Sequence, residues 1–338
     1  MINLGFWEKL NKPIFALAPM ADVTDCAFRQ IIAKYGKPDV FFTEFVSVDG
    51  LCSPGKDRLL IDLKYGERER PIVAQIFGSK PENFEKVASM LVELGFDGID
   101  INMGCPVKKV LNQNSCSALI RTPELAKEII LATKRGAGNL PVSVKTRIGF
   151  NKMEIESWVP AVLEAEPAVL TVHLRTVKEM SKVPAHWEMM RRIVEIRNEM
   201  KSKTLILGNG DVLNIDDARR KCEETGCDGI MLGRAIFGNP FLFAKQKRPE
   251  PVEGQRPLDS IRGEMYVPSI SEKLEVMIEH TKLFDKMLGT HKNFALMKKH
   301  YKAYVNGFDG AKDLRAKLME AGTANQVEAI TNDFLNGI

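Results

Sequence analysis

The alternation of short apolar runs with longer amphipathic stretches is the feature that most limits how this chain can fold. It continues from the start of the sequence to about residue 240, and it is typical of βα units around a parallel sheet. We interpret eight of the apolar runs as strands, at residues 14–20, 40–46, 72–77, 98–103, 142–147, 169–174, 204–208 and 229–232.

Eight strands with intervening helices in this length match the size of a (β/α)8 barrel. Helix candidates at residues 81–94 and 123–134 each open with a proline near the first turn, where its missing N–H group costs nothing. A doubly wound sheet is the alternative, but a nucleotide-binding Rossmann unit should show G-x-G-x-x-G after its first strand. The first strand here ends in Ala18-Pro19-Met20-Ala21. The sequence therefore predicts an α/β fold of the (β/α)8 TIM-barrel type.

The pattern changes after the eighth strand. Residues 246–270 are rich in proline, glycine and charge, which is typical of a linker or a surface insertion. From residue 271 the strand signal disappears, and helical periodicity at 274–287, 294–305 and 311–321 indicates a small all-α domain. We therefore predict a barrel domain at 1–245, a linker or insertion at 246–270 and a helical C-terminal domain at 271–338.

Composition excludes several classes of protein. The net charge of +4 on 338 residues is small, so contact with a nucleic acid must come from a local basic patch. The six cysteines form no C-x-x-C pair and no signal peptide precedes them, which favours reduced thiols over a disulfide framework. No apolar run approaches the ~18 residues of a membrane span. We expect a cytoplasmic monomer without a metal site.

In a (β/α)8 barrel the reactive groups gather at the carboxyl ends of the strands. The turns Gly208-Asn209-Gly210-Asp211 and Gly233-Arg234-Ala235 follow the seventh and eighth strands, where barrels commonly bind phosphate through backbone N–H groups. Each turn alone is equally compatible with an ordinary tight turn. Two glycine-bearing turns at neighbouring strand ends favour a phosphate site.

Four other strand ends carry groups that suggest chemistry. Lys145 interrupts an apolar strand and needs an acceptor or an anion to offset its desolvation, whereas a lone histidine such as His173 is more often a satisfied polar residue. The amide of Gln75 suits the edge of a planar heterocycle. Cys105 has the position of a nucleophile, an acid or a packing residue. Since no histidine stands beside it to form a thiolate, we expect a neutral thiol that donates a proton.

At these residues the chain resembles the FMN-dependent, bacterial type of tRNA-dihydrouridine synthase. The resemblance extends over the whole barrel and into the helical tail, where Met297-Lys298-Lys299-His300-Tyr301 and Gly310-Ala311-Lys312-Asp313-Leu314-Arg315 are similar to the family's RNA-binding domain. The barrel motifs that carry it are Ala18-Pro19-Met20-Ala21 with Thr24-Asp25, Asn102-Met103-Gly104-Cys105-Pro106, Val144-Lys145-Thr146-Arg147, Asn209-Gly210-Asp211 and Gly233-Arg234-Ala235.

The resemblance implies a tRNA-dihydrouridine synthase that reduces uridine in tRNA with FMN, with NADPH or NADH as the electron donor and Cys105 as the general acid. The residues that it implies for cofactor binding are Pro19, Met20, Ala21, Gln75, Lys145, His173, Asn209, Gly210, Asp211, Gly233 and Arg234. Those that it implies for RNA binding are Asn102, Arg147, Arg175, Lys298, Lys299, Lys302 and Arg315.

Uracil chemistry defines the reaction. The C5=C6 bond is conjugated to the C4 carbonyl, so it accepts hydride from a reduced flavin at C6 and a proton from Cys105 at C5. The base has to leave its stack to react, so the enzyme must also hold the surrounding RNA backbone. Lys286, Lys292, Lys298, Lys299 and Lys302 form one basic stretch for this purpose, although such a stretch is equally compatible with a solvated helix face.

Three positions depart from the family pattern. Leu174 stands where we expect glycine, His186 precedes Trp187 where aspartate is usual, and Ser115-Cys116-Ser117 replaces a small glycine-containing turn. We expect Cys116 to be a packing residue. Two alternatives stay open: an FMN barrel oxidoreductase acting on a small pyrimidine or other small molecule, and a catalytically idle RNA-binding protein that keeps the barrel as a scaffold.

Overall fold

The structure is a computed structural model that describes residues 2–244 and 266–337. The chain divides into two compact units, one formed by residues 1–26 and 39–234 and the other by residues 27–38 and 235–338. Residues 27–38 and 235–244 therefore group with the helical unit, although the predicted barrel domain of 1–245 includes them. Most of the predicted linker, residues 246–265, lies outside the described residues.

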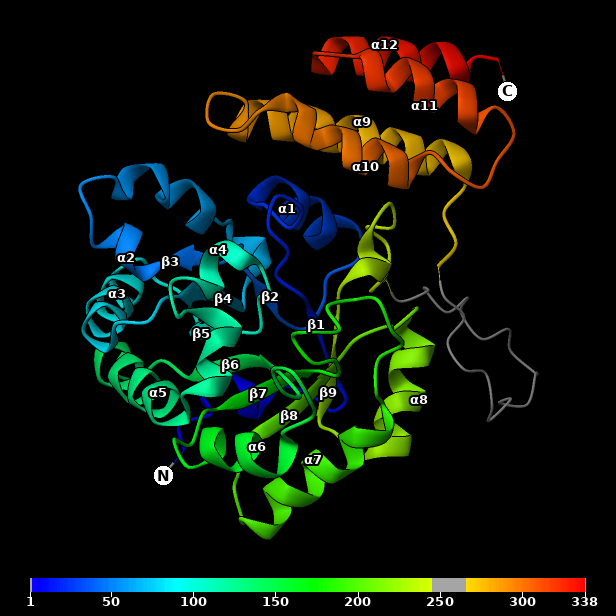
Figure 1. Ribbon diagram of the computed structural model, residues 1–338. Coiled ribbons are helices and arrows are strands. Elements are labelled where there is room, and N and C mark those ends of the chain that lie inside the picture. The colour runs from blue at the N-terminus through cyan, green and yellow to red at the C-terminus, as the bar shows by residue number, and fades with distance from the viewer. Residues whose placement is uncertain (1, 245–265, 338) are drawn as a thin grey trace, which may run out of the picture. The chain divides into compact units, whose positions relative to one another are not determined.

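The first unit is a barrel of parallel strands, as the sequence predicted (Figure 1). Its strands are β1 (Ile14–Leu17), β2 (Phe41–Phe42), β3 (Val46–Ser47), β4 (Ile72–Phe77), β5 (Gly98–Met103), β6 (Val142–Arg147), β7 (Val169–His173), β8 (Leu205–Asn209) and β9 (Gly229–Leu232). They follow the order β1-β9-β8-β7-β6-β5-β4-β2, and an isolated parallel bridge between Ala16 and Val40 brings β1 to β2 and nearly closes the barrel.

The predicted second strand, residues 40–46, is broken into β2 and β3, which both pair with β4. The register shifts by one residue between them, since Phe41 pairs with Ile72 but Val46 pairs with Ile76. At the break, Oγ1 of Thr43 accepts the hydrogen bond from the backbone N–H of Gln75 at 3.1 Å. A side chain thus replaces one ladder bond, as at a β-bulge.

Helices cover the outside of the barrel. The side chains that α3 buries are Phe84, Val87, Ala88 and Leu91, which recur at the spacing of one helix face. The α-helices of this unit are α2 (Val48–Leu51), α3 (Pro81–Glu93), α4 (Lys108–Leu111), α5 (Pro123–Ala137), α6 (Ile155–Leu163), α7 (Glu188–Glu199) and α8 (Ile215–Thr225). Its 3₁₀ helices are η1 (Gly5–Lys9), η2 (Lys56–Arg58), η3 (Leu60–Leu63), η4 (Glu67–Glu69) and η5 (Cys116–Arg121), and η6 (Arg234–Ile236) follows β9.

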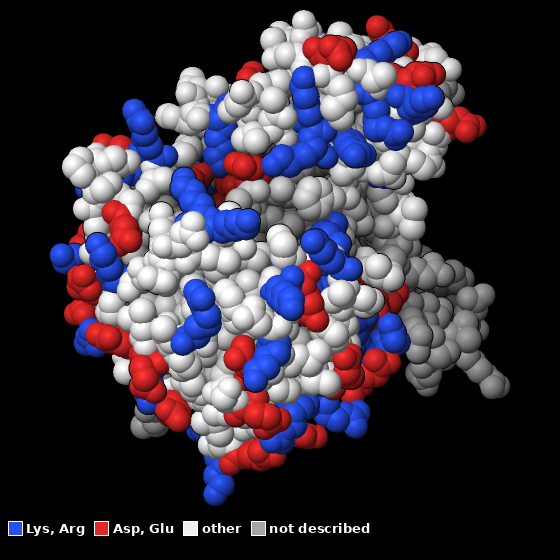
Figure 2. Space-filling model, viewed as in Figure 1, with Lys and Arg blue, Asp and Glu red and all other residues white. Residues whose placement is uncertain are grey.

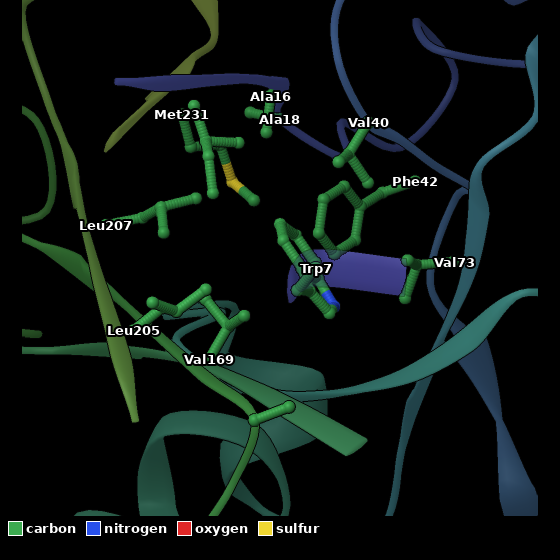
Figure 3. Close-up of a cluster of buried hydrophobic side chains, with 12 residues drawn as sticks. Trp7, Ala16, Ala18, Val40, Phe42, Val73, Val169, Leu205, Leu207 and Met231 are labelled. Carbon is green, nitrogen blue, oxygen red and sulfur yellow. The ribbon is translucent and has the colours of Figure 1, made fainter. Parts of the chain in front are cut away.

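The barrel interior is apolar at its amino end. Trp7 of η1 is 2% exposed and packs against Phe42, with 6.4 Å between ring centroids, inside a cluster that includes Val169 and Leu205 (Figure 3). Alternate strand residues face the same side, so the inward positions after Leu205 are Leu207 and then Asn209. The interior therefore becomes polar toward the carboxyl ends of the strands.

The second unit is helical, and the predicted helical segments after residue 270 are confirmed. Its helices are α1 (Cys26–Tyr35), α9 (Ile270–Leu288), η7 (Phe294–Leu296), α10 (Met297–Tyr304), α11 (Ala311–Glu320) and α12 (Ala324–Leu335). Helix α9 begins with a capping box: the hydroxyl of Ser269 accepts from the Glu272 N–H, and the Glu272 carboxylate accepts from the Ser269 N–H.

The core of the helical unit contains two fully buried histidines. Phe28 of α1 stacks on His280 of α9 and meets His300 of α10, with ring centroids 4.7 and 4.8 Å away. Within the described residues, Nε2 of His280 and both ring nitrogens of His300 have no hydrogen-bond partner. None of the helices in the described part of the chain is both long and apolar enough to cross a membrane.

Candidate active site

The polar residues at the carboxyl ends of β4, β5 and β6 pair across neighbouring strands. Gln75 stands beside Asp100, and Asn102 stands beside Lys145. These positions continue the inward-facing rows of the barrel, so their side chains converge above its apolar core. The barrel mouth is therefore lined by amide, carboxylate and ammonium groups.

A chain of hydrogen bonds connects Asp100 to Cys105. Gln75 donates from Nε2 to Oδ2 of Asp100 at 2.7 Å, and its Oε1 accepts from Nδ2 of Asn102 at 2.9 Å. Oδ1 of Asn102 then accepts from the backbone N–H groups of Gly104 and Cys105, both at 3.0 Å. Asn102 and Gln75 thus hold the loop that carries Cys105. Both side-chain amides hydrogen-bond to other groups of the protein.

Asp100 anchors this chain and was not singled out from the sequence. It is fully buried and also accepts from Oγ of Ser143 at 2.5 Å. Burial raises the pKa of Asp100 to about 6, although the hydrogen bonds from Ser143 and Gln75 act in the opposite direction. A carboxyl group in the otherwise apolar stretch before Asn102 was the signal available in the sequence.

Positive charge surrounds the ends of β6 and β7. Lys145 is half-buried and donates to Oδ1 of Asn209 at 3.1 Å, while Nδ2 of Asn209 donates to the Met231 carbonyl. Burial, helped by the charge of Arg147, lowers the pKa of Lys145 to about 8. Among the described residues, Asn209 is its one hydrogen-bond acceptor, so the ammonium group keeps donors for an added anion or heterocycle.

His173 is neutral in this environment. Burial and the positive charges of four neighbouring side chains hold its pKa far below the usual range. Nε2 of His173 lies 3.1 Å from Nη1 of Arg175, and a guanidinium can only donate, so Nε2 accepts and the ring proton is assigned to Nδ1. The four cations are Lys145, Arg147, Arg175 and Arg234.

The turn after β8 carries one carboxylate between two arginines. Asp211 accepts hydrogen bonds from Arg175 and Arg234, and from the backbone N–H of Ala185 at 2.9 Å. Burial alone would raise the pKa of Asp211, but the bonds from Arg175 and Ala185 and the two positive charges outweigh it and lower the pKa. The Asp211 carboxylate is therefore neutralised by two arginines within the protein.

The backbone next to Asp211 requires a glycine. Gly210 has φ +128°, and a Cβ at this position would lie 2.8 Å from Cβ of Ala185. The indole of Trp187 donates to the Gly210 carbonyl at 2.8 Å and holds the turn in place. Gly233, on the next strand end, lies beside Met20, whose sulfur would be 3.8 Å from a Cβ added to the glycine. The turns after β1, β8 and β9 thus lie at neighbouring strand ends, with Pro19 half-buried and Ala21 exposed.

Three residues predicted to contact RNA are buried. Arg147 is 5% exposed and donates to the carbonyls of Gly104, Thr176 and Met180, while Arg175 is 2% exposed and donates to the Val183 carbonyl as well as to Asp211. Asn102 is 6% exposed. Their polar atoms hydrogen-bond within the loops around the barrel mouth.

Cys105 is half-buried, directly after β5. A hydrogen bond from Oγ of Ser117 to its carbonyl, at 2.7 Å, joins its loop to η5. A hydrogen bond from the Cys116 thiol, followed by the Val107 N–H and the charges of Arg147 and Lys145, lowers the pKa of Cys105 to about 6 against the effect of burial. No histidine contributes to this shift; the donors that lower the pKa of Cys105 are the Cys116 thiol and the Val107 N–H.

Together these groups favour an anionic, electron-rich ligand. Four cations face the two carboxyl groups of Asp100 and Asp211, and the donors of Lys145 are not all used. Thr171, on β7 between the core and the mouth, has a buried hydroxyl without a partner among the described residues. The described residues contain no cluster of three or more His, Cys, Asp or Glu side chains that could hold a metal ion.

Comparison with known proteins assigns the chain. The profile of the dihydrouridine synthase (Dus) family matches residues 16–337. The chain belongs to the dihydrouridine synthase family. It is 42% identical over 333 residues to the probable tRNA-dihydrouridine synthase 2 of Bacillus subtilis (strain 168), covering 98% of this chain and 96% of that protein. It is 41% identical to the probable tRNA-dihydrouridine synthase of Staphylococcus aureus (strain MRSA252), covering 98% and 95% of the two chains.

Solved structures support the fold of this dihydrouridine synthase. Histamine dehydrogenase from Rhizobium sp. 4-9 superposes with a TM-score of 0.50 at 15% identity, covering 68% of this chain and 44% of that one. A 2-naphthoyl-CoA reductase superposes with a TM-score of 0.50 at 11% identity, covering 69% and 49%. At these identities the likeness concerns the barrel fold alone.

Two positions at which this dihydrouridine synthase departs from the family pattern lie beside the site. Leu174 is fully buried, and its N–H donates to the Asn209 carbonyl at 3.0 Å. His186 lies between Glu179 and Glu188, with 3.1 Å from a ring nitrogen to each carboxylate. Burial would lower the pKa of His186, but these two bonds outweigh it and raise the pKa. His186 thus lies between two acidic side chains, each of which is within hydrogen-bond distance of its ring.

The lysines predicted to bind RNA lie in the helical unit. Helix α10 carries Lys298, Lys299 and Lys302 and contains no acidic residue, and Figure 2 shows Lys and Arg side chains gathered over the face that carries α10. Lys302 is exposed, and Lys298 and Lys299 are half-exposed. Arg315 of α11 donates to the Val305 carbonyl at 2.6 Å and is half-exposed, so part of its guanidinium is already used.

Proposed function

We propose that this dihydrouridine synthase reduces uridine in tRNA to dihydrouridine, with FMN as its cofactor, NADPH as the electron donor and Cys105 as the proton donor. The observation that carries the proposal is the position of Cys105. Its backbone N–H donates to Asn102 at the barrel mouth, and the charges of Lys145 and Arg147 act on its thiol. The reduction of a base requires a proton donor and nearby positive charge, and both lie at the same end of the barrel.

The residues present fit FMN. The glycine turn at Gly210 and the turn at Gly233 offer backbone N–H groups, and Arg234 adds a largely exposed guanidinium beside them. Lys145 and the neutral His173 would meet the electron-rich ring, and Met20 of the β1 turn lies next to Gly233. When bound and reduced, FMN supplies the hydride for C6 of the base.

Cys105 supplies the proton. After C6 has been reduced, negative charge builds toward C5 and O4, and the thiol proton moves to C5. Lys145 and Arg147 favour that charge because both act at the position of Cys105. A pKa of about 6 for the Cys105 thiol lies close to neutral pH, which is the range in which a general acid is most effective.

In this proposal the helical unit binds tRNA. Lys298, Lys299 and Lys302 present positive charge from one short helix, which suits phosphate contacts that carry no sequence preference. In the same proposal residues 1–245 form the FMN-binding domain, residues 246–270 a linker or insertion and residues 271–338 the tRNA-binding domain. A chain acting on a free pyrimidine would have no use for such a basic unit.

The test is product formation. The purified protein, supplied with FMN and NADPH, is incubated with unmodified tRNA, and nucleosides are analysed by mass spectrometry for a uridine that has gained two hydrogen atoms. Free uridine and free uracil serve as the matched substrates for the alternative of a small-molecule oxidoreductase. Dihydrouridine in tRNA alone is expected. Reduction of the free pyrimidines with none in tRNA would contradict the proposal, and so would a protein that takes up no FMN.

A further inference from the structure

Two of the six cysteines lie close together at the amino end of β9. The sulfur of Cys222, in the last turn of α8, is 3.7 Å from the sulfur of Cys227, which stands two residues before the strand. Both cysteines are free and buried, and the Cys227 sulfur also lies 3.4 Å from the Gly229 carbonyl oxygen. The sequence contains no C-x-x-C pair, but the fold brings these two thiols into contact.

The way in which α8 ends explains why the two cysteines meet. Gly226 has the left-handed conformation, with φ +74°, and its N–H donates to the Cys222 carbonyl at 2.8 Å. At such a helix end the residue after the glycine commonly packs against the last turn of the helix. Cys222 and Cys227 occupy the two positions of this contact. Other apolar residues could pack there equally well, but only two cysteines can form a covalent bond.

The contact is close enough for a disulfide to form with a small movement. Bonded sulfurs lie about 2.0 Å apart, so the two sulfurs have to approach by about 1.7 Å from their separation of 3.7 Å. The turn between them has space to adjust, because nothing outside the turn lies within 4 Å of the position that a Cβ on Gly226 would take. The backbone therefore leaves room for the bond.

Cys227 is the more reactive thiol of the two. A hydrogen bond from Cys222, followed by bonds from Thr225 and from backbone groups of Gly229 and Gly208, lowers the pKa of Cys227 to about 7 against the effect of burial. The same hydrogen bond and burial raise the pKa of Cys222. Because the thiolate is the reactive form of cysteine, Cys227 is the sulfur that an oxidant attacks first.

We propose that Cys222 and Cys227 are a site of reversible oxidation, at which a small peroxide converts the two thiols into a disulfide. The Cys227 sulfur takes one peroxide oxygen, so an S–O bond forms and the O–O bond breaks. The Cys222 sulfur then attacks the Cys227 sulfur, so the S–S bond forms and the S–O bond breaks. The two sulfurs lose two electrons, and the peroxide with both thiol protons becomes two water molecules. A dithiol reductant reverses the reaction.

The disulfide would join the end of α8 to a segment that is already anchored. Asp228, the next residue after Cys227, accepts hydrogen bonds from Lys12 at 2.6 Å, from Arg197 at 3.1 Å and from the Ile206 N–H at 2.8 Å. A cross-link restricts the unfolded chain, which stabilises the folded state if the fold accepts the bond without strain. We therefore expect the oxidised protein to unfold at a higher urea concentration than the reduced protein.

The test is treatment of the FMN-loaded full-length protein with hydrogen peroxide, followed by alkylation of the remaining thiols under denaturing conditions and digestion with trypsin. Trypsin cleaves after Lys221 and Arg234, so peptide 222–234 contains both thiols and no other cysteine. We expect this peptide to become two hydrogen atoms lighter and to take up no alkyl group. Dithiothreitol should restore two alkyl groups. Cleavage after Glu223 or Glu224 separates the two cysteines, and only a disulfide keeps the fragments joined.

Cys222→Ala is the matched control, because Cys227 keeps its thiol but has no partner with which to close the bond. We expect Cys227 to gain oxygen in this variant and the urea midpoint not to rise after treatment. Cys52, which is exposed, reports in the same digest that the oxidant has acted. Two alkyl groups on peptide 222–234 after Cys52 has been oxidised would overturn the proposal, and so would a urea midpoint that falls when the disulfide forms. The measurement involves neither tRNA nor NADPH, so its outcome is independent of the proposed function.

Discussion

Replacing Lys145 with methionine is expected to stabilise the cofactor-free protein while weakening its affinity for FMN. Methionine keeps a side chain of similar length and removes the charge. The charge is poorly compensated in the cofactor-free state, since the ammonium group donates to the neutral Asn209 and burial lowers the pKa of Lys145 from 10.5 to about 8. A ligand that compensates this charge recovers that free energy on binding.

The size of the effect follows from the two pKa values. Holding the proton in the folded protein at pH 7 costs about 3 kcal/mol, at about 1.36 kcal/mol per pH unit. Because Lys145 keeps some exposure to solvent, we expect a net gain of about 1–3 kcal/mol in the variant. Below pH 8 Lys145 is protonated in both the folded and the unfolded protein, so the folded protein bears the full free-energy cost of the charge. Between pH 8 and 10.5 the folded protein releases the proton first, so the gain should fall below about 1 kcal/mol at pH 10.

Urea denaturation followed by tryptophan fluorescence measures the free energy of unfolding of the barrel unit, because Trp7, Trp158 and Trp187 all lie in it. The control is Lys134→Met, whose ammonium donates to two backbone carbonyls at 3.1 Å and should lose about 1 kcal/mol. FMN titration should show affinity reduced roughly 10- to 100-fold in Lys145→Met alone. A Lys145→Met protein less stable than wild type at pH 7, or with the same gain at pH 10, would refute the reasoning.

Three further outcomes are expected. Arg234→Ala should weaken FMN binding about tenfold in an equilibrium titration, because an exposed charge-assisted bond contributes at the low end of its range. Replacing Lys298, Lys299 and Lys302 with alanine should make the plot of log tRNA affinity against log salt shallower by about two to three, with flavin reduction by NADPH unchanged. Burial lowers the pKa of His300 from 6.5 to about 3 and also lowers that of His280, so below pH 6.5 the unfolded chain takes up protons that the folded unit does not. Hydrogen exchange in α9 and α10 should therefore show at least about 2 kcal/mol less protection at pH 5 than at pH 8, and His300→Leu should reduce that loss by about 2 kcal/mol.

The barrel could be predicted because its signal is local. Each strand of a doubly covered parallel sheet is an apolar run, and β4, β5 and β6 have the bounds that those runs predict. The break between β2 and β3 depends on a bond from Gln75 to the Thr43 side chain, which residues far apart in sequence make. Helix α12 was missed because its buried face is short, with Ala324, Val327 and Thr331.

The sequence predicted where the site lies but not which of its side chains bond to one another. Strand ends identified Lys145, His173 and Asn209, since a barrel places all strand ends at one mouth. Which groups neutralise one another depends on rotamers, so the salt bridge of Arg175 with Asp211 had no signal in the sequence. The bond from Ser117 to the Cys105 carbonyl joins a 3₁₀ helix to a loop at no regular spacing, and it also had no signal in the sequence.

The most direct test of the account is a single-turnover measurement of the proposed proton transfer. Enzyme with reduced FMN is mixed under anaerobic conditions with unmodified tRNA, and flavin reoxidation is followed by stopped-flow absorbance. We expect Cys105→Ala to bind FMN and to be reduced by NADPH as wild type does, but to reoxidise about 100- to 10,000-fold more slowly with tRNA. Equal reoxidation rates for wild type and Cys105→Ala would contradict the account.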